Sequence, residues 1–188
     1  QRMEIKETLL QQYDRCYNEN GWFVAVRNAI DGISVEQAAW KPADPVNCIW
    51  ETLSHITYYN NAYLQRFKGI DYQYDVACND GTFSTGEYSE ADWRSDVARF
   101  DAVMTEWREL IEAAPEEKFN QSAANDQGNW AELIANINAH NAHHGGQIVR
   151  RGDAARSELF RADGRDRDRH VLQVFAALGR GHDDFAQA

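Results

Sequence analysis

Prolines are scarce in this sequence, and their placement points to a helical chain. Only three occur, Pro42, Pro45 and Pro115, and two of them share one short segment. The long proline-free stretches carry apolar residues at three- and four-residue spacing, which is the period of one face of an α-helix. No stretch shows the alternation of apolar and polar residues that is typical of a strand. The sequence therefore predicts an all-α fold.

Capping residues and glycines mark where the helices begin and end. Ser34 is followed three residues later by Gln37, which matches a capping box, and Ser89 is followed by Asp92 at the same distance. Gly69 indicates the end of a helix, because glycine readily adopts the left-handed backbone that closes one. These signals predict long helices over residues 3–30, 47–68, 89–113 and 129–151, and a short helix over residues 35–40.

The second and third long helices are separated by a long segment. Residues 69–88 are rich in Gly, Asp, Asn and Thr and have no helical or strand period, so we expect a connection. Such a connection in a compact domain is often functional or a crossover. Four long helices joined in this way predict a four-helix bundle with a long crossover connection, not a simple up-down-up-down bundle.

The length of 188 residues suits one domain, and we expect the bundle to occupy residues 1–150. Residues 151–169 carry six Arg and five acidic residues, which is typical of a solvated segment. The apolar spacing of residues 171–179 predicts one more short helix. We therefore interpret residues 151–188 as a charged C-terminal extension with a short helix, either part of the same domain or a tail.

The charge of the chain limits its partners. The formal net charge is -11, so the surface repels phosphates and we expect neither nucleic acid nor an anionic membrane as a partner. No apolar run approaches the ~20 residues that span a bilayer, and the first residues contain no apolar signal-peptide core. Cys16, Cys48 and Cys78 are odd in number and far apart, which favours a reducing cytoplasm and opposes a cysteine-based zinc site.

Half of the six histidines fall within five positions, in the string "HNAHH". His140 and His144 are four residues apart, so on a helix they project from one face and can chelate one divalent ion. No glutamate follows the first of them, which excludes the HExxH protease motif. His143 lies three residues from His140 and could substitute as a ligand.

Two ligands make a weak site, so we look for a third. His55 lies midway along a predicted helix among residues spaced to face the core, and bundles build metal sites from facing helices. His170 and His182 lie in the weakly patterned tail, which makes His55 the best candidate. The alternative is that these histidines are surface residues or hydrogen-bonded core residues with no metal.

Three neighbours are candidate catalytic or orienting groups. Gln147 shares the helix face of the histidine pair and could orient a ligand or a water, or simply bond a neighbouring helix. Glu51 lies one turn before His55 and could accept from its ring or act as a base, or be an exposed helix residue. Tyr59 lies one turn after His55 and could donate to a substrate oxygen, or be plain core.

Two motifs in this sequence resemble one family. "HNAHHGGQI" resembles the HxxHHxGQ signature of the DinB-like (YfiT-type) metalloenzymes, and "GISVEQAAWKPADPVNCIWETLSHI" resembles that family's loop and first histidine-bearing helix. The likeness covers residues 3–150 and does not extend to the tail. It implies a four-helix bundle in which His55, His140 and His144 hold one divalent ion and His143 does not.

The same resemblance implies a class of function. It implies a small-molecule substrate, a homodimer and one divalent transition metal, which could be Zn, Ni, Fe, Mn or Co. Some family members resemble transferases that use a low-molecular-weight thiol, so we expect a metal-dependent, thiol-dependent S-transferase. The alternatives are a metal-dependent hydrolase and a non-catalytic metal or small-ligand binding protein related to stress.

Overall fold

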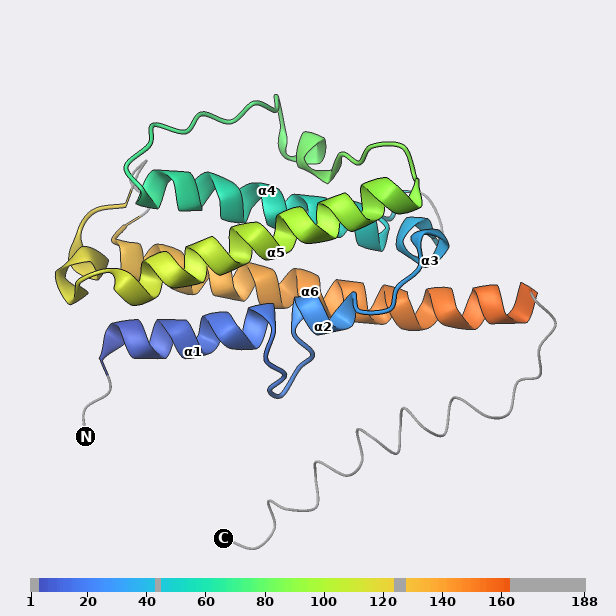
Figure 1. The fold of residues 1–188 in the computed structure, drawn as a ribbon, viewed down its shortest axis with the longest axis horizontal. Helices are drawn as coiled ribbons and strands as arrows, with labels where there is room; N and C mark the ends of the chain where they lie inside the picture. Colours follow the sequence, from blue (N-terminus) through green and yellow to red (C-terminus); the bar gives the residue numbers. More distant parts are fainter. Residues whose placement is uncertain (1–3, 43–44, 124–127, 163–188) are drawn as a thin grey trace, which may run out of the picture. The chain divides into compact units, whose positions relative to one another are not determined.

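The computed structural model describes residues 4–42, 45–123 and 128–162, and within them the chain is helical (Figure 1). No strand occurs in these ranges beyond an isolated bridge between Ser122 and Asn129. The all-α prediction is confirmed. The α-helices are α1 (Ile5–Tyr17), α2 (Val26–Ala29), α3 (Val35–Ala39), α4 (Ile49–Phe67), α5 (Glu90–Ala113) and α6 (Trp130–Ala162), with 3-10 helices η1 (Asn79–Phe83) and η2 (Glu116–Asn120).

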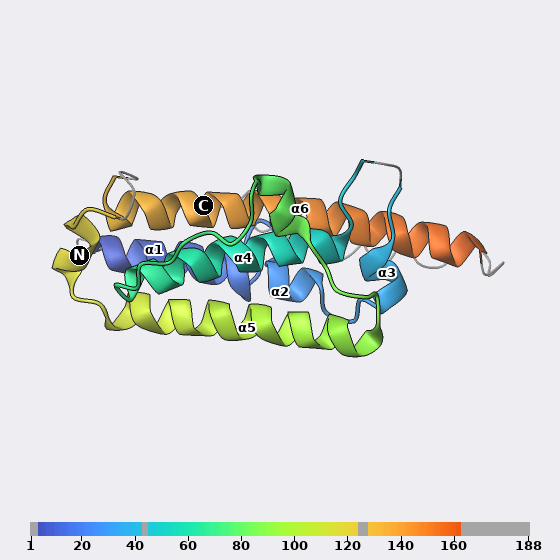
Figure 2. The same cartoon turned by 90° about the horizontal axis from the view of Figure 1, so that it is seen from above.

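Four of these helices, α1, α4, α5 and α6, form a bundle within the compact unit of residues 1–155. Helices α4 and α5 run in the same direction, and both run opposite to α1 and α6 (Figures 1 and 2). Because consecutive parallel helices cannot be joined by a short turn, the chain between them must return along the whole length of α4. The predicted crossover connection is confirmed, and it carries η1.

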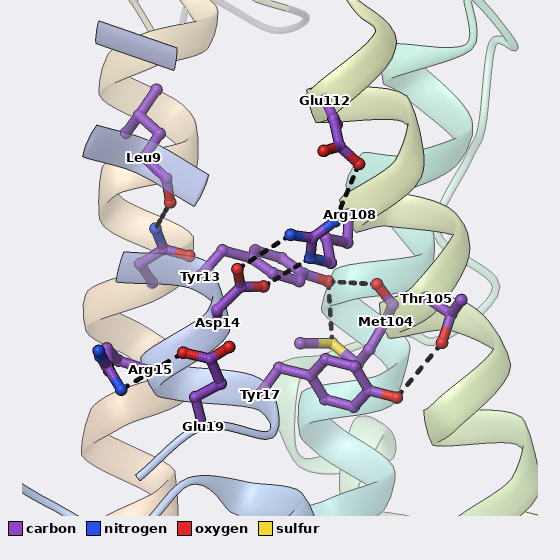
Figure 3. Close-up of polar contacts among 11 residues, drawn as sticks. Leu9, Tyr13, Asp14, Arg15, Tyr17, Glu19, Met104, Thr105, Arg108 and Glu112 are labelled. Carbon is purple, nitrogen blue, oxygen red and sulfur yellow. Dashed lines mark hydrogen bonds and ion pairs between the residues drawn. The ribbon is translucent and has the colours of Figure 1, made fainter. Parts of the chain in front are cut away.

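Helices α1 and α5 are held together by one buried and one partly buried polar contact (Figure 3). Tyr13 is fully buried and donates its hydroxyl to the carbonyl of Met104 at 2.9 Å. Burial raises the pKa of Tyr13 well above its usual value, so it stays a donor. Arg108 donates to both carboxylate oxygens of Asp14, at 2.7 and 3.1 Å. This bidentate contact requires a defined orientation of both side chains, so it fixes the position of α1 along α5.

Helices α4 and α6 are joined by two buried amides. Asn60 donates to the side-chain oxygen of Asn141 at 2.9 Å, and Asn141 donates back to Asn60 at 3.1 Å. Neither side chain is exposed to solvent. Sliding one helix past the other would leave both amides buried and unpaired, at a cost of about 1–3 kcal/mol each. The pair therefore sets the register of the two helices that carry the histidines.

The ends of α4 follow the sequence signals closely. A capping box joins Cys48 and Glu51, in which the Glu51 carboxylate accepts the Cys48 N–H at 2.8 Å. Gly69 ends the helix in the left-handed region, with φ of 84°. The predicted caps Ser34 and Ser89 also accept backbone N–H groups at the starts of α3 and α5.

The single helix predicted over residues 3–30 is wrong, because the chain forms α1 and α2 with a turn between them. The side chain of Asn20 accepts from the backbone N–H of Ala25 at 3.0 Å and from the side chain of Asn28 at 2.9 Å. An asparagine that bonds nearby backbone groups offers the chain an alternative to the helix ladder. The string "NENG" therefore breaks a helix that apolar spacing alone would continue.

The predicted end of the last long helix at residue 151 is also wrong, since α6 continues to Ala162. Residues 153–159, "DAARSEL", are mostly good helix formers, and polar residues extend a helix without any apolar stripe. The short helix predicted over residues 171–179 lies outside the described residues, as do His170 and His182. No helix in the described part of the chain is both long and apolar enough to cross a membrane.

We expect Asn60→Ala to lower the free energy of unfolding by about 1–3 kcal/mol, because it leaves the buried Asn141 amide without its partner. Asn61→Ala is the matched control on the same helix. Asn61 is only partly buried and accepts from Gln65 alone, so its loss should cost under about 0.5 kcal/mol. Urea denaturation followed by circular dichroism measures both. An Asn60→Ala/Asn141→Ala double variant that costs the full sum of the single variants would contradict a coupled pair.

Candidate metal centre

Three histidines from two antiparallel helices meet at one point. His55 comes from α4 and His140 and His144 come from α6, and one ring nitrogen of each lies within 4.8 Å of the others. Nε2 of His55 is 3.0 Å from Nε2 of His140. His55 is only 3% exposed. The sequence predicted that these three side chains would come together, and the structure brings them together.

The hydrogen bonds of Thr82 determine which nitrogen of His55 is free. Its hydroxyl donates to the carbonyl of Asn79 at 2.6 Å, so the same oxygen must accept from Nδ1 of His55, also at 2.6 Å. Nδ1 therefore carries the proton, and the lone pair of Nε2 points toward His140. Thr82 is 2% exposed, so water does not compete for this bond. A hydrogen bond of this kind is the usual outer partner of a metal-ligating histidine.

Gln147 plays a similar part for His144. Its side-chain oxygen lies 3.0 Å from Nδ1 of His144, and its amide nitrogen lies 2.9 Å from Nε2 of His143. With the amide oxygen as acceptor, Nδ1 of His144 carries the proton and Nε2 is free for a ligand. His143 is exposed and is not one of the three converging residues.

Burial keeps the three rings neutral. Desolvation lowers the pKa of His55 to about 3, with a smaller contribution from the neighbouring histidines. Desolvation likewise lowers the pKa of His144 to about 4 and that of His140 below its usual value. A neutral imidazole has a lone pair to give, so all three rings can coordinate an ion at neutral pH.

The donor set fits a divalent transition metal. Two nitrogens bound to one ion at 2.0–2.1 Å lie about 3.0–3.4 Å apart, and the separation of the His55 and His140 nitrogens is 3.0 Å. Three neutral nitrogen donors are the ligand type of open zinc-like sites, which keep a further position for a small molecule. No sulfur or carboxylate joins the group of three among the described residues.

A cavity of about 410 Å³ lies beside the three rings. Phe83 from η1 closes one side, stacked on His55 with ring centroids 4.0 Å apart and planes 10° apart. Tyr59 packs edge-on to His55 and His140 at 5.0 and 5.7 Å. The lining residues are His55, Tyr59, Tyr63, Asn79, Phe83, Leu133, Asn136, Ile137, His140 and His144.

The three candidate catalytic residues occupy different places. Tyr59 lines the cavity and donates its hydroxyl to the side chain of Asn79 at 3.0 Å. Gln147 contacts His144 without lining the cavity. Glu51 does neither: its carboxylate caps α4 and pairs with Lys41 at 2.8 Å. Among the described residues, the Glu51 carboxylate bonds Lys41 and Cys48 and not the ring of His55, which was one of the roles considered for it.

Sequence reasoning missed the residues that η1 contributes. Asn79, Thr82 and Phe83 lie in a segment without period, where no helical arithmetic can assign a direction to a side chain. The only available signal was the length of the connection, which is typical of a functional segment. Asn60 and Asn141 were also missed, because an amide at a core-facing helix position does not reveal its partner on another helix.

The fold and the site together define a class of proteins, all-α bundles that bring three histidines from two helices to one point. A family model, that of the DinB superfamily, matches residues 24–148, which run from the turn before α2 to the histidine-bearing part of α6. This chain therefore belongs to the DinB superfamily. No curated protein and no solved structure shows significant similarity to it.

Thr82→Val should weaken metal binding about 10- to 100-fold, because the loss of an outer hydrogen bond frees the tautomer and orientation of the His55 ring. Valine has nearly the same shape, so the core stays filled. Thr82→Ser retains the hydroxyl and should bind metal within a few-fold of the parent. Competition with a chromophoric chelator measures each affinity. Equal affinities for the valine and serine variants would contradict this orienting role.

The metal-free protein should lose stability as the pH falls below neutrality. Above pH 6.5, the ordinary histidine pKa, His55 is neutral in both the folded and the unfolded chain and has no effect. Between that value and its folded pKa of about 3, only the unfolded chain takes up the proton, so unfolding becomes more favourable. From pH 7 to pH 5, the contribution of His55 alone lowers the free energy of unfolding by about 2 kcal/mol.

Urea midpoints of the metal-free protein at the two pH values measure this loss. His55→Gln removes the titrating ring and should reduce the loss between pH 7 and pH 5 by about 2 kcal/mol. His143→Gln is the control, since His143 is exposed, and it should keep the parental pH dependence. A His55→Gln variant that loses as much stability as the parent would rule out this origin.

Proposed function

We propose that this protein is a metal-dependent enzyme in which His55, His140 and His144 hold one divalent transition metal. The observation that carries the proposal is the convergence of three ring nitrogens within 4.8 Å of one another. Their lowered pKa values keep them unprotonated at neutral pH. The candidate ions are Zn, Ni, Fe, Mn and Co, since ligand geometry and availability rather than raw affinity decide among them.

When bound, such an ion supplies a Lewis acid that lowers the pKa of a coordinated water or thiol. The chain itself supplies orientation. Thr82 and Gln147 hold two of the imidazoles by their Nδ1 atoms, which keeps the Nε2 atoms convergent. The cavity beside the rings gives a small-molecule substrate access to the same point.

We propose a thiol rather than water as the activated group. A hydrolase that works through water commonly uses a positioned carboxylate as general base. In the described part of the chain, no Asp or Glu lines the cavity, and Glu51 is paired with Lys41. On such an ion a coordinated thiol is deprotonated outright, whereas coordinated water has a pKa of about 7, so the thiol needs less assistance from a base.

The proposed reaction is transfer of a low-molecular-weight thiol to an electrophilic carbon. The thiol loses its proton to solvent, its sulfur forms a bond to that carbon, and the leaving group departs with the electron pair of the broken bond. The three histidines would hold the ion that binds the sulfur, and the cavity that they line would hold the acceptor. No redox change occurs, so no oxidant or reductant is required.

The first experiment measures metal content by elemental mass spectrometry, together with melting temperature. His55→Ala, His140→Ala and His144→Ala should lose near-stoichiometric metal, because each removes one of three ligands. His143→Ala, the matched control in the same string, should keep it. A wild type that carries no metal after reconstitution with Zn, Ni, Fe, Mn and Co would contradict the metal site.

A second measurement separates the possible reactions. The metal-loaded protein is mixed with a low-molecular-weight thiol and 1-chloro-2,4-dinitrobenzene, and thioether absorbance is followed. The parent should accelerate thioether formation and His140→Ala should not. Turnover of an ester without any thiol would instead favour the hydrolase. A metal that cannot be removed without unfolding the bundle would favour a non-catalytic structural site in a binding protein.

The homodimer and the cytoplasmic location stay predictions. The acidic composition supports the expectation that neither nucleic acid nor an anionic membrane is a partner. Size-exclusion chromatography with light scattering measures the oligomeric state directly. None of these features is needed for the proposed site, whose ligands all come from one chain.

A further inference from the structure

We infer that the cavity beside the three histidines binds an uncharged acceptor with an apolar, preferably aromatic, body. This inference rests on the proposed function, because it takes the cavity as the acceptor-binding side of the metal centre. It goes further by naming the class of substrate.

Half of the residues that line the cavity are apolar or aromatic and lie beside the three histidines. Tyr59 and Tyr63 come from successive turns of α4 and stack with planes 23° apart and centroids 6.5 Å apart. Leu133 and Ile137 lie one turn apart on α6 and line the same cavity, and Phe83 completes it from η1. Aromatic walls of this kind favour a flat, apolar ligand, which gains stacking contacts in addition to burial.

Apart from the ion that the histidines would hold, no charged side chain of the described residues lines this space. The lining set contains no Asp, Glu, Lys or Arg among the described residues. The phenols of Tyr59 and Tyr63 carry no charge at neutral pH, since the ordinary pKa of tyrosine is about 10. An acceptor that carried a carboxylate or a phosphate into the cavity would leave its hydration shell and find no side-chain counter-charge, which is costly in free energy.

Two cations near the site are already engaged. Arg151, whose charge acts on His144, donates to the hydroxyl of Thr52 at 2.7 Å. Arg66 lies over the rings of Tyr63 and Tyr74, at 5.5 and 4.5 Å from their centroids. It also donates to the carbonyl of Tyr72 at 3.3 and 3.2 Å and to the hydroxyl of Tyr74 at 3.1 Å. These bonds direct the guanidinium toward the crossover connection, so it does not serve as an anion-binding group for the cavity.

Polar recognition at the cavity comes from neutral amides. The side-chain oxygen of Asn79 accepts from Tyr59. Asn136 lies on α6, one turn before His140, and is exposed at the rim. Its amide bonds no other described residue, so it can donate to, or accept from, a neutral polar group of a ligand. These two amides can hydrogen-bond carbonyl, nitro or hydroxyl substituents of an uncharged acceptor.

Three hydroxamic acids test the inference by binding to the metal-loaded protein, with calorimetry as the readout. Acetohydroxamic acid probes the metal alone, benzohydroxamic acid adds an aromatic ring, and 4-carboxybenzohydroxamic acid adds a charge to that ring. We expect the ring to improve affinity about tenfold or more through apolar burial. The carboxylate should cancel most of that gain, because the cavity offers it no partner.

A designed cation should reverse the discrimination. Asn136→Lys places a positive charge at the rim and should improve binding of 4-carboxybenzohydroxamic acid at least fivefold relative to the parent. Ala135→Lys is the matched control, since Ala135 is the adjacent exposed residue of α6 and does not line the cavity. It introduces the same charge and should leave the order of the three affinities unchanged.

The outcomes separate this inference from the proposed function. If metal is bound and acetohydroxamic acid binds as tightly as benzohydroxamic acid, the substrate class is wrong while the metal centre stands. Equal affinities of the parent for both aromatic probes would overturn the requirement for an uncharged acceptor. If the protein carries no metal and binds none of the three probes, the proposed function fails and this inference fails with it.

Discussion

The register between α4 and α6 is the constraint on which the candidate site depends, and the reciprocal amide pair of Asn60 and Asn141 sets it. Apolar packing alone tolerates some sliding of one helix along another. Two buried amides do not, because any shift leaves donors and acceptors unpaired where water cannot reach them. His55 lies five residues before Asn60, and His140 immediately precedes Asn141. The pair therefore holds Nε2 of His55 and Nε2 of His140 at 3.0 Å, a separation at which one ion can bind both.

The parallel direction of α4 and α5 has a second consequence for the site. It forces the connection between them to pass along α4 (Figures 1 and 2), and Phe83 of η1 stacks on His55. Thr82 and Phe83 thus contact His55 from a segment that the topology already requires. Thr82 fixes the tautomer of the His55 ring, and Phe83 covers one face of it. A shorter connection between antiparallel helices would have left His55 without an outer hydrogen bond.

The features that could be predicted from the sequence are those encoded by local spacing. The caps Ser34 and Ser89, the stop at Gly69 and the helix face shared by His140 and His144 all depend on residues within a few positions of one another, and all match the structure. His55 could be added because the bundle needs a facing helix and the family motif supplies one. The break near Asn20 escaped prediction because side-chain bonds to the local backbone compete with apolar periodicity. Contacts made across the fold, such as that of Thr82, have no local signature at all.

The burial that keeps the histidines unprotonated also affects which ligands can bind in the cavity beside them. Burial lowers the pKa of His55 because the protonated ring loses its hydration, and a charged ligand that enters the adjoining cavity also loses hydration. The chain carries a net charge of -11, yet none of its carboxylates lines this cavity among the described residues. An ion held by three neutral imidazoles keeps its full charge for the group that it binds. Because the cavity offers no charged side chain to a charged acceptor, we propose that it favours an uncharged one.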